Sequence, residues 1–148
     1  MWARWIRISW IFYQNKFKVI GIDNDFRKFF FGKDASTSWV KSYLKIKYNK
    51  DYKHFNLNIA KINEVKKIFK KYKDKIKVVI HSAAQPSHDW ASSNPELDFN
   101  INAIGTLNML NLTKKYLNKK TRFIYMSTNK VYGDNPNKLK IKNNKLRF

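Results

Sequence analysis

The 148-residue sequence contains no cysteine, only four glycines and only ten acidic residues. The absence of cysteine excludes a disulfide framework, a thiolate zinc site and a cysteine nucleophile. Three histidines, at positions 54, 81 and 88, are too few and too scattered for a metal cluster, so we expect no metal site. The longest apolar run near the N-terminus covers residues 8–13, whereas a membrane span needs about 20 residues. We therefore expect a cytoplasmic protein without a membrane partner.

The scarcity of acidic residues leaves a formal net charge of +21, because lysine and arginine together number 31. A strongly basic chain can bind nucleic acid or an acidic partner subunit. However, 26 of the 31 cations are lysines, and asparagine and isoleucine are abundant, which is typical of AT-rich coding. Contacts with bases and phosphates more often use arginine. We favour solvated lysines and keep a basic, non-catalytic module that binds nucleic acid or a partner subunit as the alternative.

Short apolar runs alternate with amphipathic segments along the chain. The predicted strands are residues 18–23, 54–59, 77–81 and 122–126. The predicted helices are residues 60–73 and 95–117, and loops are expected over 24–39 and 82–94. Near-continuous apolar strands between helices predict an α/β fold with a doubly wound parallel sheet. The length allows one domain.

Polar residues follow each predicted strand, and ligands of such sheets bind beyond the carboxyl ends of the strands. These residues are Asp23, Asn58, Ser82–Gln85 and Ser127–Lys130. An acid in the position of Asp23 can accept hydrogen bonds from the ribose hydroxyls of a dinucleotide, which would favour NAD over NADP. Aspartate also commonly begins a turn, so this signal is weak by itself.

Small residues give two further signals. The segment Ser82-Ala-Ala-Gln85 would let a cofactor lie against the backbone, although a tight turn explains the same residues. Gly105 lies inside the last predicted helix, where glycine costs about 1 kcal/mol relative to alanine. We expect another backbone to approach the helix closely at this point.

The segment Met126-Ser-Thr-Asn-Lys-Val-Tyr-Gly-Asp134 places hydroxyl groups at the end of an inner strand, followed by Val-Tyr-Gly. In this respect the chain resembles the extended short-chain dehydrogenase/reductase family of nucleotide-sugar epimerases and dehydratases. Further segments look like the CDP-paratose 2-epimerase (CDP-tyvelose epimerase) branch, and the resemblance covers residues 17–148. These segments are Gly21–Arg27, Phe30–Gly32, Ser36–Trp39, His81–Trp90 and Ser127–Asp134.

The resemblance implies a partial Rossmann-type domain and an NAD-dependent isomerase. The reaction it implies is inversion of C2 of a CDP-hexose, CDP-paratose to CDP-tyvelose, through a 2-keto intermediate with no net consumption of NAD. It also implies a CDP-sugar substrate and allows a homo-oligomer like those of the family.

The resemblance also assigns roles to individual residues. Thr128 would be the catalytic hydroxyl that hydrogen-bonds the reacting sugar oxygen. The family usually has aspartate where Asn58 stands. The implied cofactor-binding residues are Asp23, Asn24, Asn58, Ile59, Ala83, Ala84, Gln85 and Asn102. The implied substrate-binding residues are Gln85, His88 and Lys130.

The N-terminal segment departs from the family pattern. The family begins with a strand and a glycine-rich turn, and counting back from Asp23 places this turn at residues 1–7. Trp2, Trp5 and Arg7 stand there instead, and such side chains cannot occupy positions that need glycine. Our hypothesis is that residues 1–8 are a glycine-rich segment read in the wrong frame or from a false start. Residues 1–16 would then be an aberrant N-terminus, and the glycine-rich first βα unit would be missing. Residues 17–148 would then be the partial NAD-binding domain.

Two consequences follow for activity and packing. The family's Tyr-x-x-x-Lys pair should come after Thr128. Two pairs earlier in the chain, Tyr43…Lys47 and Tyr116…Lys120, have the same spacing. They lie in other elements, and a lysine-rich chain produces such matches by chance. With this pair and the C-terminal substrate domain absent, we expect the chain alone to be inactive. In a 3-2-1-4-5 strand order the first strand is central. Without it, the strands around residues 19–22 and 78–80 should lack their shared neighbour, and the core should split.

Overall fold

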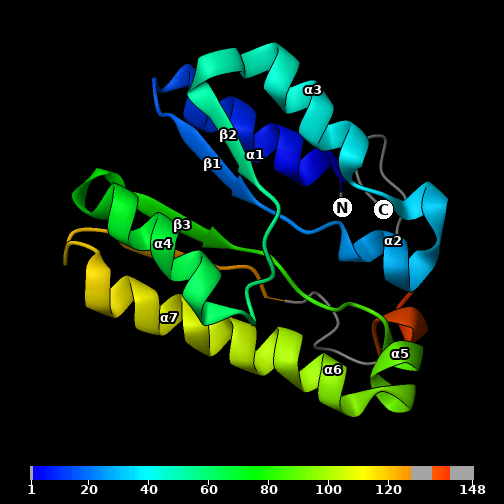
Figure 1. Ribbon diagram of the computed structural model, residues 1–148. Coiled ribbons are helices and arrows are strands. Elements are labelled where there is room, and N and C mark those ends of the chain that lie inside the picture. The colour runs from blue at the N-terminus through cyan, green and yellow to red at the C-terminus, as the bar shows by residue number, and fades with distance from the viewer. Residues whose placement is uncertain (1, 128–134, 141–148) are drawn as a thin grey trace.

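The structure is a computed structural model, which describes residues 2–127 and 135–140. Four short strands alternate with helices, as expected for an α/β fold (Figure 1). The strands are β1 (Val19–Ile22), β2 (Tyr52–Phe55), β3 (Val78–His81) and β4 (Arg122–Tyr125). The helices are α1 (Trp2–Gln14), α2 (Phe26–Phe31), α3 (Ser38–Tyr48), α4 (Ile62–Tyr72), α5 (His88–Ser93), α6 (Pro95–Phe99) and α7 (Gly105–Tyr116). A π-helical segment, Asn100–Ile104, joins α6 to α7, and 3-10 turns cover Lys33–Ala35, Asn49–Asp51, Lys73–Lys75 and Asn135–Lys138.

The strands form two separate parallel pairs. β1 pairs with β2, with Val19 opposite Tyr52, and β3 pairs with β4, with Val78 opposite Arg122. In the part of the chain that the structure describes, no strand joins β1 to β3. The expected loss of a shared neighbour between these two strands is therefore confirmed. β1 and β3 nevertheless run in the same general direction, so their carboxyl ends lie on one side of the molecule (Figure 1).

The first pair of strands is covered by α1 and α3. The buried core of this half consists of Val40, Leu44 and Tyr48 from α3 together with Tyr52 from β2. We did not predict α3, although Val40, Leu44 and Tyr48 recur every four residues, the spacing of one helix face. The three lysines and Ser42 between them obscured the signal. Residues 2–14, which looked aberrant, form a continuous helix, and no strand precedes it among the described residues.

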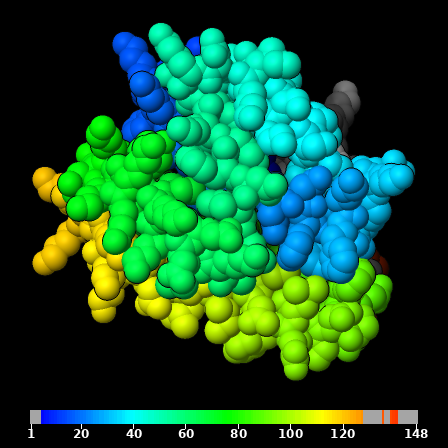
Figure 2. Space-filling model, in the orientation of Figure 1, coloured from blue at the N-terminus to red at the C-terminus, as the bar shows by residue number. Residues whose placement is uncertain are grey.

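The second pair of strands packs against α4 and α7. A separate buried cluster holds this half together, with α4 and α7 side by side (Figure 1). Its members are Ile59, Val65, Phe69, Val79, Met109 and Leu112. The predicted helix over residues 60–73 is confirmed as α4, because its apolar residues at helical spacing include Val65 and Phe69. Side chains of α3, in cyan, and of α4, in green, reach the same face of the surface (Figure 2).

The two predicted loops are partly helical. α2 lies within residues 24–39, and α5 lies within residues 82–94. Before α2, Asp25 has a positive φ of 58° and accepts hydrogen bonds from the hydroxyls of Ser36 and Thr37. Partial burial acts to raise the pKa of Asp25, but hydrogen bonds from Thr37 and Ser36 outweigh it and hold the pKa below its usual value. These contacts link residues 11 and 12 positions apart, which no local pattern reveals.

Two other predictions need correction. The second strand is Tyr52–Phe55 rather than residues 54–59, because the residues after Phe55 turn toward α4. The long predicted helix over residues 95–117 is interrupted by the π-helical segment. Gly105 lies at the end of this segment, and the group that approaches it is the side chain of Ile59 rather than a backbone.

We predict that Gly105→Ala destabilises the chain by about 1–2 kcal/mol, because overpacking a core outweighs the gain in helix propensity. A Cβ atom at Gly105 would lie 2.6 Å from Cδ1 and 2.8 Å from Cγ1 of buried Ile59. Ile59→Val removes Cδ1, so the double variant should be more stable than the sum of the single changes predicts. Urea denaturation measures all three free energies. Additive effects would show that Ile59 does not cause the loss.

No helix in the described residues is long and apolar enough to cross a membrane. The same residues contain no group of three or more His, Asp or Glu side chains placed to hold a metal ion.

Candidate cofactor site

A cleft opens where the carboxyl ends of the two strand pairs meet. It contains about 750 Å³ of empty space, part of it open to solvent. Its walls come from the segments that follow β1, β2 and β3, together with Trp5 of α1 and Ile101 of the π-helical segment. The structure brings six of the eight predicted cofactor-binding residues into this cleft. They are Asp23, Asn24, Asn58, Ile59, Ala83 and Ala84.

Asp23 stands at the centre of the site, directly after β1. Its backbone N–H donates to the carbonyl of Phe55, which keeps the residue in line with the neighbouring strand (3.2 Å). Its Oδ1 accepts from the N–H of Asp25 at 2.7 Å. Asp23 therefore begins a turn and also lines the cleft, so both interpretations of this residue apply.

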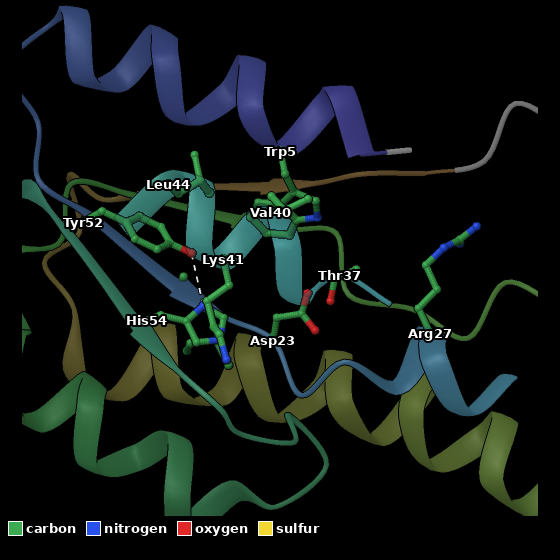
Figure 3. A pocket seen from close by; sticks show the side chains of 11 residues that line it. Trp5, Asp23, Arg27, Thr37, Val40, Lys41, Leu44, Tyr52 and His54 are labelled. Atoms are coloured by element: carbon green, nitrogen blue, oxygen red, sulfur yellow. Dashed lines mark hydrogen bonds between the residues drawn. The ribbon is translucent and has the colours of Figure 1, made fainter. Parts of the chain in front are cut away.

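A second cavity, with about 530 Å³ of empty space, shares Trp5 and Asp23 with the cleft (Figure 3). Apolar side chains from α1 and α3, among them Trp5 and Leu44, form part of its wall. The hydroxyl of Tyr52 lies 3.1 Å from Nδ1 of His54 in this cavity. Burial, with a smaller contribution from Asp23, raises the pKa of Tyr52 to about 12, and burial lowers the pKa of His54. Both groups are therefore uncharged at neutral pH.

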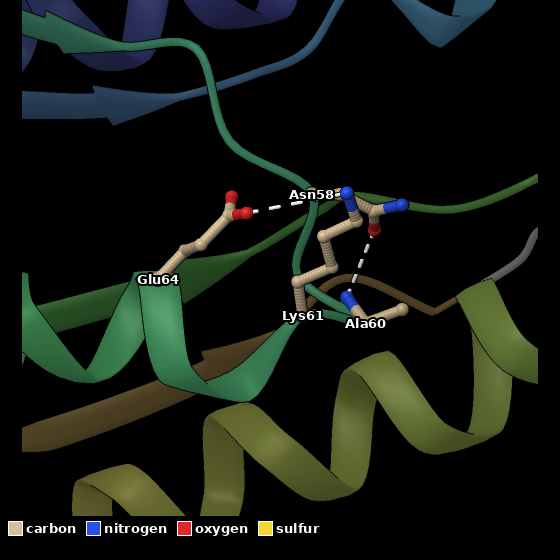
Figure 4. Close-up of polar contacts among 4 residues, drawn as sticks. All are labelled: Asn58, Ala60, Lys61 and Glu64. Carbon is tan, nitrogen blue, oxygen red and sulfur yellow. Dashed lines mark hydrogen bonds and ion pairs between the residues drawn. The ribbon is translucent and has the colours of Figure 1, made fainter.

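Asn58 is held in a turn that precedes α4 (Figure 4). Its Oδ1 accepts from the N–H of Ala60 at 2.9 Å, and its carbonyl accepts from the N–H of Lys61 at 3.0 Å. An aspartate side chain could accept the same hydrogen bond from Ala60. Asn58 can therefore take the place of the aspartate that the family usually has at this position. Lys61 and Glu64 also form an exposed ion pair at 4.0 Å, which contributes little in water.

α7 fixes the backbone next to Asn58. Asn108 is buried in α7, and its Nδ2 donates to the carbonyls of Ile59 and Ala60, both at 3.0 Å. Sequence reasoning missed Asn108, because its partners lie 48 and 49 positions earlier in the chain. The wall that carries Ile59 is thus tied to the second half of the molecule.

Gln85 and Asn102 lie behind the cleft and hold its wall. The N–H of Gln85 donates to Oδ1 of Asn102 at 2.9 Å, and Nδ2 of Asn102 donates to the carbonyl of Gln85 at 3.1 Å. Asp98 accepts from the side-chain amides of both residues. Gln85 is only 5% exposed, so its amide is engaged within the protein. This network orders the segment that presents Ala83 and Ala84.

His81 extends the network toward the sheet. Its Nε2 lies 2.8 Å from Oγ1 of Thr106, and that hydroxyl donates to the carbonyl of Asn102 at 2.6 Å. Since the hydroxyl has one proton, His81 is the donor of the first bond. Burial lowers the pKa of His81, so it remains neutral at pH 7. Through Asn102, the π-helical segment thus connects β3 to the loop that carries Gln85 and forms one wall of the cleft.

Residues 11–146 of the chain match the NAD dependent epimerase/dehydratase family. The chain belongs to this family. Over 77 residues it is 40% identical to CDP-paratose 2-epimerase of Salmonella typhi, and this stretch is 52% of the chain and 22% of that relative. Over 121 residues it is 32% identical to UDP-glucuronate 4-epimerase of Thermodesulfobacterium geofontis, and this stretch is 80% of the chain and 34% of that relative. The chain thus spans between about a fifth and a third of the length of these family members.

Solved structures support the family fold. Pal from Bacillus thuringiensis matches with a TM-score of 0.66 at 20% identity, over 86% of this chain and 36% of that one. UDP-glucose 4-epimerase from Bifidobacterium longum matches with a TM-score of 0.64 at 21% identity, over 84% of this chain and 34% of that one. These likenesses show that this epimerase-family chain has a partial Rossmann-type fold.

NAD is the cofactor of this family. A carboxylate, an asparagine-containing turn and two alanines face one space. Ser82 also lines the cleft, and its hydroxyl oxygen is buried without a hydrogen-bond partner in the described residues. Ser82 belongs to the polar segment that the sequence placed at this edge of the sheet, although its hydroxyl was assigned no role of its own. Trp5 stands in the cleft as well, and no glycine-rich turn is present among the described residues.

Of the remaining predicted site residues, the structure describes only His88, which does not line the cleft. His88 is exposed at the start of α5, a helix that Ser87 caps by accepting from the N–H of Trp90. Thr128 and Lys130 lie outside the described residues. The Tyr43…Lys47 pair, which matched the family's spacing, is formed: Lys47 Nζ donates to Tyr43 Oη at 2.7 Å. Both side chains are exposed on α3, away from the buried face of that helix.

Proposed function

We propose that this chain forms the part of an NAD-dependent nucleotide-sugar epimerase that holds the adenosine half of NAD. One observation carries the proposal: residues following three different strands, which the sequence singled out separately, line one cleft. In α/β folds such a cleft at the carboxyl ends of the strands is the usual ligand site. Family membership supports the same assignment.

The geometry suggests a role for each wall. The carboxylate of Asp23 would accept hydrogen bonds from the ribose hydroxyls, with Asn24 beside it. Asn58 and Ile59 would flank the adenine on the wall that Asn108 fixes. Ala83 and Ala84 have no bulky side chains, so the cofactor could lie against their backbone. In this arrangement Gln85 and Asn102 act by holding that wall.

For the complete enzyme, we propose the inversion of C2 of a CDP-hexose. The local 40% identity to CDP-paratose 2-epimerase supports this choice over other nucleotide sugars. NAD would supply a reversible hydride acceptor. Thr128 would hydrogen-bond the reacting sugar oxygen, and His88 and Lys130 would face the sugar, as the family resemblance implies.

Saturation-transfer NMR with NAD⁺ and the 148-residue chain tests the proposal. We expect stronger saturation of the adenine and adenosine-ribose protons than of the nicotinamide protons, because the proposed site would hold the adenosine half. NADP⁺ should bind more weakly, since its 2′-phosphate would meet the carboxylate of Asp23. Absent saturation, or equal saturation of both halves of NAD⁺, would contradict the assigned site.

A further inference from the structure

Tyr52 and His54 lie on one face of β2 and line the cavity that contains Asp23 (Figure 3). Alternate residues of a strand share a face, so β2 presents these two side chains together. The parallel register places Val19 opposite Tyr52 and Gly21 opposite His54. Asp23 comes two residues after Gly21. Tyr52, His54 and Asp23 are therefore consecutive neighbours along one face.

Gly21 leaves room for the ring of Tyr52. A Cβ atom on Gly21 would lie 3.1 Å from Cζ of Tyr52 and closer still to its hydroxyl oxygen. The hydroxyl therefore occupies the space where a side chain of β1 would otherwise stand. From this position it reaches His54, whose Nδ1 lies 3.1 Å away.

His54 connects Tyr52 to Asp23. Burial lowers the pKa of His54, whereas the charge of Asp23 and a hydrogen bond with the Asp23 backbone act to raise it. A hydrogen bond that favours the protonated ring is donated by the ring, so the carbonyl of Asp23 is the acceptor. Tyr52 and Asp23 lie on opposite sides of His54 along the face, so they meet different nitrogens. Since the neutral ring has one N–H, Nδ1 accepts from Tyr52 and Nε2–H donates to Asp23.

Three contacts thus hold Asp23 in place. Its N–H donates to the carbonyl of Phe55, and its Oδ1 accepts from the N–H of Asp25. Both partners are backbone groups, which nearly any residue at these positions would supply. The contact with His54 is different, because it depends on one particular side chain.

We propose that His54 is a positioning residue that orients Asp23 toward the ribose, and that Tyr52 holds the ring of His54 in the orientation that does so. The inference rests on the proposed function, since it concerns the same adenosine site. Neither Tyr52 nor His54 lines the cleft in which the adenosine would lie. Both residues therefore act through Asp23 rather than by touching the cofactor.

Two replacements of His54 test this role by isothermal titration calorimetry of the full chain with NAD⁺. The amide nitrogen of glutamine comes near the position of Nε2 and can donate to Asp23, whereas asparagine reaches only near Nδ1. We expect His54→Gln to stay within about 2-fold of the wild-type affinity. His54→Asn should lose about 3-fold to 10-fold, the effect of one neutral hydrogen bond. A purely structural role predicts the same loss in both variants, because both remove the ring.

A matched control and a second variant complete the calorimetry. Lys53 is the exposed neighbour on the opposite face of β2, so Lys53→Gln should change affinity less than 2-fold. Tyr52→Phe keeps the buried ring and removes only the hydroxyl, and it should weaken binding about 2-fold to 5-fold. Circular dichroism checks folding, and Tyr52→Phe still tests the role if His54→Asn unfolds.

Nitrogen NMR of the ¹⁵N-labelled chain tests the bond between Tyr52 and His54 without NAD⁺. The Nδ1 resonance of His54 is identified by its absence in His54→Gln. In Tyr52→Phe it should move toward the value of a nitrogen that accepts no hydrogen bond.

The outcomes separate this role from the proposed function. A wild-type chain that binds no NAD⁺ would contradict the proposed function, and the role of His54 with it. Wild-type binding combined with equal affinities of His54→Gln and His54→Asn, or with an unmoved Nδ1 resonance in Tyr52→Phe, would overturn the positioning role alone.

Discussion

Asp23→Asn is expected to weaken NAD binding by roughly 10-fold to 100-fold, which corresponds to losing a hydrogen bond to a charged group. The ribose hydroxyls would donate to the carboxylate of Asp23, and a neutral amide presents one acceptor where the carboxylate presents two. The turn should survive, because the amide oxygen can still accept from the N–H of Asp25. Isothermal titration calorimetry with NAD⁺ gives the affinity, and a thermal melt checks the fold.

Two other aspartates separate binding from folding. Asp34 is exposed, so Asp34→Asn should change neither affinity nor stability. Asp25 accepts hydrogen bonds from Ser36 and Thr37, so Asp25→Asn should lower the melting temperature. If Asp23→Asn retains wild-type affinity while the chain binds NAD⁺, the ribose is held by other residues.

Phe69→Ala is expected to unfold the half of the chain built on β3 and β4 while the half built on β1 and β2 keeps its structure. Phe69 is 2% exposed, and truncating such a residue costs about 3–5 kcal/mol. A whole domain is stable by about 5–15 kcal/mol, and this chain divides its core into two clusters. The cluster around Leu44 does not include Phe69, so it should respond less.

Hydrogen exchange measured by mass spectrometry resolves the two halves. Protection should fall in α4, β3 and α7 and persist in α3 and β2. Lys70→Ala, an exposed change one residue away, is the control and should leave both halves unchanged. Uniform loss of protection in Phe69→Ala would mean that the two clusters unfold as one unit.

The strand ends were the part of the site that could be predicted from sequence. Short apolar runs ending in Asp23 and His81 mark buried strands, and parallel strands bring their carboxyl ends together. α4 was equally predictable, because Val65 and Phe69 recur at helical spacing. α3 was missed, since three lysines and a serine stand between its three buried residues.

Contacts between distant residues account for the rest of the site. Gln85 and Asn102 were expected to touch ligands, yet their polar atoms bond to each other and to Asp98. Asn108 was overlooked, although it fixes the wall that carries Ile59. A local pattern identifies a polar residue near a site but does not identify its partner.

The sequence by itself determined the α/β class, the family, and the polar residues at the carboxyl ends of the strands. These follow from hydrophobic periodicity and local motifs, which operate over a few neighbouring residues. Only the tertiary structure decided that the sheet is divided between β1 and β3, and that α1 packs against α3. Packing decided both, because strand pairing and helix contacts depend on which buried surfaces meet across the folded chain.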